Sequence, residues 1–162
     1  MTTPVIPTSS SIMAQVRDIL YADADIIAWC QGKYADGPYV WLGMDDRNLP
    51  DSTQYPLIAV LSVTQIRGAD AHQLKWDVEI NCVIHNDNIS VTGRQSTCDG
   101  LLDVETLREL AENALYKARF ATITSDGLSM TISDFPLFES ITKIRISVPA
   151  SFRSGISKRL SS

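Results

Sequence analysis

The chain has 162 residues, of which 44% are hydrophobic and 20% charged, with a formal net charge of −5. This length and composition are typical of a globular protein of about one domain. The acidic balance argues against a protein that binds nucleic acid by neutralising phosphates, and no apolar run approaches the roughly 20 residues that would cross a bilayer.

The chain begins with a short segment that has no periodicity. Residues 1–8 contain two prolines and predict an extended arm, without the basic and apolar regions of a cleaved signal peptide. Ser9 to Ser11 offer an N-cap for a helix whose apolar stripe runs from Ile12 to Leu20. A second short helix is predicted from Asp25, as its cap, to Gln31, with Gly32 as its stop.

The middle of the chain predicts strands. Residues 39–42 are rich in β-formers, and the polar residues 44–55 predict a surface loop. Two further strands, 57–66 and 74–85, flank a turn at Arg67 to Asp70. The second alternates with period two, which predicts one buried face and one polar face. Its apolar positions are Leu74, Trp76, Val78, Ile80, Cys82 and Ile84.

The remaining elements complete an α+β domain. Residues 86–100 are polar and predict a loop, because the pair Ile89 and Val91 is too short a signal for a strand. A helix is predicted from its cap at Asp103 to Phe120, followed by strands at 128–132 and 138–148. We therefore expect a mostly antiparallel or mixed sheet of about five strands, with two to three helices packed on one face. The domain spans 9–149, and a basic tail spans 150–162.

Chemistry-bearing residues are few. The two histidines, His72 and His85, lack the spacing of metal ligands, and no nucleophile or phosphate-loop motif is present. The paired carboxylates Asp45 and Asp46, with Asp51, are typical either of a solvated loop or of an ion or acid–base site. The three cysteines, an odd number without a CxxC pair, indicate reduced thiols in a cytoplasmic setting. We expect no catalytic residue, no metal and no cofactor.

Several residues are candidates for contacts with a partner. Trp41 lies on a short strand, where it is either core or an exposed interface anchor. The basic tail is either solvated or docked on an acidic partner surface. Together the candidate interface residues are Trp41, Arg47, Arg67, Arg153, Lys158 and Arg159.

The order of these elements resembles that of the tail terminator (tail completion) proteins of long-tailed bacteriophages. The likeness covers residues 9–149 and rests on the opening amphipathic helix and a polar loop leading into Tyr55-Pro56-Leu57-Ile58-Ala59-Val60. It continues with a hairpin that contains Trp76-Asp77-Val78-Glu79-Ile80, the helix at 103–120 and two closing strands.

The resemblance implies a structural virion protein, assembled in the host cytoplasm, that is not an enzyme. Its subunits would form a hexameric ring on the last ring of the tail tube, end tube polymerisation and offer a surface to the head–neck proteins. In contractile tails the ring would also contact the last sheath ring. DNA would pass through the lumen without specific binding, which agrees with the acidic net charge, and no membrane is involved.

Three other readings of the sequence stay open. One is another head–tail neck or connector protein. The second is a small cytoplasmic hydrolase that uses the loop Asp45 to Asp51 with His72 or His85. The third is a module that binds a small molecule or peptide through Trp41 and the sheet edge.

Overall fold

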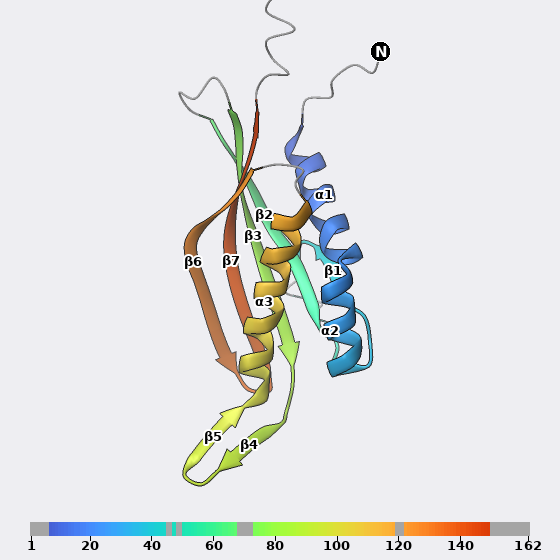
Figure 1. The fold of residues 1–162 in the computed structure, drawn as a ribbon, viewed down its shortest axis with the longest axis vertical. Coiled ribbons are helices and arrows are strands. Elements are labelled where there is room, and N and C mark those ends of the chain that lie inside the picture. Colours follow the sequence, from blue (N-terminus) through green and yellow to red (C-terminus); the bar gives the residue numbers. More distant parts are fainter. Residues whose placement is uncertain (1–6, 45–46, 48–49, 68–72, 119–121, 150–162) are drawn as a thin grey trace, which may run out of the picture.

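The computed structural model describes residues 7–44, 47, 50–67, 73–118 and 122–149. The fold is α+β, as predicted, with a five-stranded mixed sheet and a separate two-stranded sheet in the described part of the chain (Figure 1). In chain order the elements are α1 (Ser9–Ala22), α2 (Ala24–Tyr34), β1 (Tyr39–Leu42), β2 (Leu57–Ile66), β3 (Gln73–His85), β4 (Ile89–Thr92), β5 (Gln95–Cys98), α3 (Asp99–Ala118), β6 (Thr122–Asp134) and β7 (Leu137–Pro149).

The main sheet has the order β1-β2-β3-β7-β6. β1 runs parallel to β2, whereas the other neighbouring strands pair antiparallel. β3 and β7 pair along their whole lengths, from Gln73 opposite Pro149 to His85 opposite Leu137. The order leaves β1 and β6 as the two edges of the sheet, at opposite ends of the row of strands (Figure 1).

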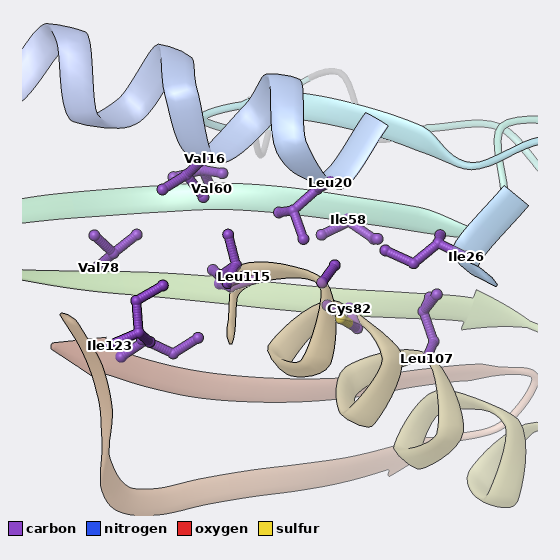
Figure 2. Packing of buried hydrophobic residues seen from close by; sticks show 14 of the residues in the cluster. Val16, Leu20, Ile26, Ile58, Val60, Val78, Cys82, Leu107, Leu115 and Ile123 are labelled. Carbon is purple, nitrogen blue, oxygen red and sulfur yellow. The ribbon is translucent and has the colours of Figure 1, made fainter. Parts of the chain in front are cut away.

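The hydrophobic core lies between the sheet and the helices. The alternation predicted for β3 is confirmed, because Trp76, Val78 and Ile80 are fully buried and belong to the core cluster. Figure 2 shows side chains of α1 and α3 packed against those of the sheet, including Leu20 and Leu115. The apolar face of each amphipathic element is thus removed from water, and this burial is the main stabilising contribution to folding.

The opposite face of β3 is more buried than its sequence suggested. Asn81 and Val83 are each only 3% exposed, although they alternate with the core-facing residues. Part of the polar loop lies against the end of this strand, since the Tyr55 ring stacks on His85 with centroids 6.0 Å apart, and Pro50 in the loop is buried. The loop before β2 is therefore not wholly a surface segment.

The ends of the first two helices differ from the prediction. Thr8, not a serine, caps α1, because its side chain accepts from the Ser11 backbone N–H while Ser11 Oγ accepts in return from Thr8. Asp23 rather than Asp25 caps α2. Gly32 lies inside α2, and the helix ends at Ala35 with φ +59°. A local carboxylate or hydroxyl at the right offset decides each start.

Three predictions in the second half of the chain are wrong. β4 and β5 form a hairpin where a loop was expected. α3 begins at Asp99 rather than at Asp103, which is buried. β6 begins at Thr122 rather than at residue 128, and its pairing with β7 is irregular between Ser125 and Ser129.

Candidate functional site

Exposed apolar side chains mark both edges of the main sheet. At the β6 edge, Met130 and Ile132 are 56% and 39% exposed, and Phe135 in the following turn is 47% exposed. We call these three residues the β6-edge patch. At the β1 edge, Leu42 is exposed and Tyr21, at the end of α1, is 64% exposed. Because β1 and β6 lie at opposite ends of the row of strands, these are two different surfaces.

A groove of about 510 Å³ lies beside β1. We call it the β1-edge groove; its lining residues are Tyr21, Ile27, Gln31, Asp36, Gly37, Pro38, Tyr39, Val40 and Trp41. The acidic group of the groove is Asp36, whose Oδ1 accepts from the Gly37 N–H at 2.7 Å and whose Oδ2 accepts from the Tyr39 hydroxyl at 3.1 Å. The hydrogen bond to Asp36 raises the pKa of Tyr39. The groove is thus aromatic, with one fixed carboxylate.

The β4–β5 hairpin, residues 89–98, projects from the end of the domain (Figure 1), and we call it the hairpin arm. Ile89 and Val91 are 51% and 69% exposed. Strand alternation and the pairing of Ile89 with Cys98 and of Val91 with Ser96 place these four residues on one face. The turn uses Gly93 at φ +61°, a conformation that suits glycine.

The base of the hairpin arm is held by a buried polar cluster. Asp103, 5% exposed, accepts hydrogen bonds from the Tyr34 hydroxyl and, at 3.1 Å, from Asn86 Nδ2, and Lys33 Nζ lies 3.0 Å from its Oδ1. The Asp99 N–H donates to the Asn88 carbonyl at 3.1 Å across the base of the hairpin. The arm is therefore anchored to both α2 and α3.

A second polar cluster joins α3 to the sheet. Arg108 and Glu112 are charged, yet their side chains are only 14% and 18% exposed, and they pair at 2.9 Å. Glu112 accepts from Thr142 at 2.8 Å, and Glu105 accepts from Ser140 at 2.9 Å. These carboxylates satisfy hydroxyls on the helix-facing side of β7, so the cluster supports the fold.

Ionisation at this interface follows from its hydrogen bonds. Burial alone would raise the pKa of Glu105, but hydrogen bonds from Thr131, Arg108 and Ser140 lower it overall. Burial likewise would lower the pKa of Arg108, whereas its two carboxylate partners raise it. Burial raises the pKa of the Cys30 thiol to about 12 and that of Cys82 further still. Both thiols behave as small apolar core groups, as predicted for Cys82.

The structure brings one of the predicted interface residues into the groove. Trp41 is half-buried and lines the β1-edge groove. Arg47 and Arg67 are exposed. Arg153, Lys158 and Arg159 lie outside the described residues, as do Asp45, Asp46 and His72.

In the contacts described, the acidic loop reaches His85 only through the ring of Tyr55. Asp51 accepts hydrogen bonds from Thr53 in its own loop, which lower its pKa. Among the described residues, no three or more histidines, cysteines or acids gather in a way that could hold a metal ion. Within the same ranges no helix is both long and apolar enough to cross a membrane.

Sequence reasoning missed the hairpin arm. Gly93, with apolar residues at alternate positions before it, was the available signal. In comparison with known proteins, no family model matches the chain, and no curated protein matches it.

Proposed function

We propose that this chain is the subunit of a ring that caps the tail tube of a long-tailed bacteriophage or a related contractile particle. The ring ends polymerisation of the tube, and where a sheath is present of the sheath, and presents the surface to which the head–neck proteins attach. The order of elements in the sequence and the two edges that the described part of the sheet presents, β1 and β6, support this role.

One observation carries the proposal: apolar side chains are exposed at two different surfaces, the β6-edge patch and the β1 edge. Contact between two different surfaces of identical chains is heterologous, and it produces a closed ring when the rotation between subunits closes. Exposed apolar groups at a sheet edge also favour association with another chain. The acidic net charge suits a ring through which DNA slides without adhering.

Self-association is tested with the purified full chain. Light scattering and negative-stain microscopy should show a ring with a mass near six subunits, alone or with the tube protein. Ile132→Glu places a charge in the β6-edge patch and should abolish the ring. Its neighbour Ser133, which is also exposed, provides the matched control as Ser133→Glu. If both variants form rings as the wild type does, the β6-edge patch is not an assembly surface.

The capping role needs a separate measurement. Tube protein polymerised with increasing amounts of this chain should give shorter tubes, each with density at one end by electron microscopy. Tubes of unchanged length without end density would refute the capping role. Unchanged tubes together with binding of this chain to purified head–neck proteins would favour a connector protein instead.

A further inference from the structure

The hairpin arm exposes the apolar side chains of Ile89 and Val91, although Cys98 on the same face packs against the core. Ile89 and Val91, both on β4, project from the same face of the hairpin. Its two strands are each only four residues long. A two-stranded hairpin of this kind is marginally stable in water unless its apolar face packs on something. The anchoring of its base through Asp103 holds the arm away from its own domain (Figure 1). A partner surface is therefore needed.

The β1-edge groove has the matching properties. Its walls are formed largely by aromatic and aliphatic side chains, Tyr21, Ile27 and Trp41 among them. It borders an edge strand that is also four residues long and, among the strands that the structure describes, pairs only with β2. Such an edge accepts a short additional strand.

Charge distinguishes the occupant of the groove. The arm carries exposed Arg94 in its turn, whereas the groove carries Asp36. Two opposite charges brought together at the rim of an interface favour this orientation over its reverse. An acidic peptide would instead be repelled by Asp36. The chain thus contains both an apolar arm with a cationic tip and an apolar groove with an anionic rim.

We propose that the hairpin arm of one subunit docks in the β1-edge groove of a second copy of the same chain, with Ile89 and Val91 against the groove wall and Arg94 beside Asp36. The inference rests on the proposed ring and names one contact between neighbouring subunits, in addition to the β6-edge patch. Arm and groove are different surfaces, so repetition of the contact continues head to tail until the ring closes.

Cysteine crosslinking between two variants tests this contact. Gln95→Cys places a thiol on the arm and Gln31→Cys places one in the groove, both in a Cys98→Ser background; Gln31 and Gln95 are exposed. A mixture of the two variants should form a disulfide-linked dimer under mild oxidation, and neither variant alone should do so. Gln95→Cys mixed with Ser133→Cys, on the other sheet edge, is the matched control. Absence of the arm–groove dimer overturns the inference.

Charge exchange provides a second test that does not depend on thiols. Arg94→Glu and Asp36→Lys should each weaken self-association about tenfold or more, as measured by sedimentation. Each substitution removes the ion pair at the rim and places two like charges together, and a tenfold loss corresponds to about 1.4 kcal/mol of association free energy. The two variants mixed, or combined in one chain, should recover most of the wild-type association. Failure of the combination to recover it, with all variants folded by circular dichroism, overturns the inference.

The outcomes separate the arm contact from the capping role. Rings that cap tubes without the arm–groove crosslink refute the inference and leave the capping role standing. A crosslink in particles that leave tube length unchanged supports the inference and refutes the capping role. Crosslinking of tube protein to Gln31→Cys, with no link to Gln95→Cys, assigns the groove to the tube protein and overturns the inference.

Discussion

Replacing Gly100 by alanine should destabilise the protein, although alanine is the better helix former. Gly100 lies in the first turn of α3, and a Cβ there would be 2.4 Å from Cδ2 and 2.5 Å from Cε2 of Phe138. It would also lie 3.0 Å from Asn86 Cβ. Phe138 is fully buried, so its ring cannot give way without disturbing its neighbours in the core. The added methyl group therefore requires displacement of α3 or of Asn86, whose side chain bonds to Asp103 at the base of the hairpin arm.

The size of the loss follows from two opposed effects. Gly→Ala in a helix contributes up to about 1 kcal/mol of stability, whereas overpacking a core costs about 1–3 kcal/mol. We expect a net loss of about 1–2 kcal/mol in the free energy of unfolding. For a chain of this length each kcal/mol lowers Tm by about 2–4 °C. Urea denaturation followed by circular dichroism measures the first quantity, and a thermal scan measures the second.

Gly32→Ala is the matched control. Gly32 is also helical, but a Cβ there meets no atom within 4 Å. This variant should be stabilised by about 0.5–1 kcal/mol, because only the helix preference changes. If Gly100→Ala is as stable as the wild type while Gly32→Ala behaves as expected, the close packing of α3 on Phe138 is refuted.

Two further predictions concern the polar cluster between α3 and the sheet. Arg108→Ala leaves the carboxylates of Glu105 and Glu112 facing the sheet without their cation, so the free energy of unfolding in urea should fall by about 3 kcal/mol. The exposed Arg17, which pairs with a neighbouring acid, should lose less than about 1 kcal/mol as Arg17→Ala, and equal effects of the two substitutions would contradict the buried role of Arg108. The pKa of Glu105 is lowered from 4.5 in the folded protein, so its contribution to stability is present above about pH 4.5 and is lost as the pH falls through the folded-state value. Glu105→Gln should remove that part of the acid dependence in denaturation curves measured from pH 7 to pH 3, and a pH dependence identical to that of the wild type would show that Glu105 does not contribute.

The strongly patterned parts of the fold could be predicted from the sequence. β3 was recognisable because a half-buried strand alternates with period two, from Trp76 to Ile84. β7 and the body of α3 follow for the same reason, since long elements contain enough turns or pleats for the pattern to be unambiguous. The α+β class then follows from the order of the elements.

Short or exceptional segments could not be predicted in this way. β4 and β5 are only four residues long, so the alternation of Ile89 and Val91 was too short to predict a strand. Asp103 was predicted to cap the helix, and the charge on Arg108 gives no sign that its side chain is largely buried. Burial of such groups depends on partners far away in the chain, Tyr34 for Asp103 and Glu112 with Thr142 beside Arg108.

The linear sequence by itself determined which segments are amphipathic, because the spacing of apolar residues is a local property. Tertiary structure alone decided that β1 and β6 are the edges, that the arm's apolar face and the groove are different surfaces, and that the acids of α3 meet hydroxyls of β7. Each of these facts depends on which strands become neighbours. That choice is made by packing between residues distant in the chain, so no local pattern records it.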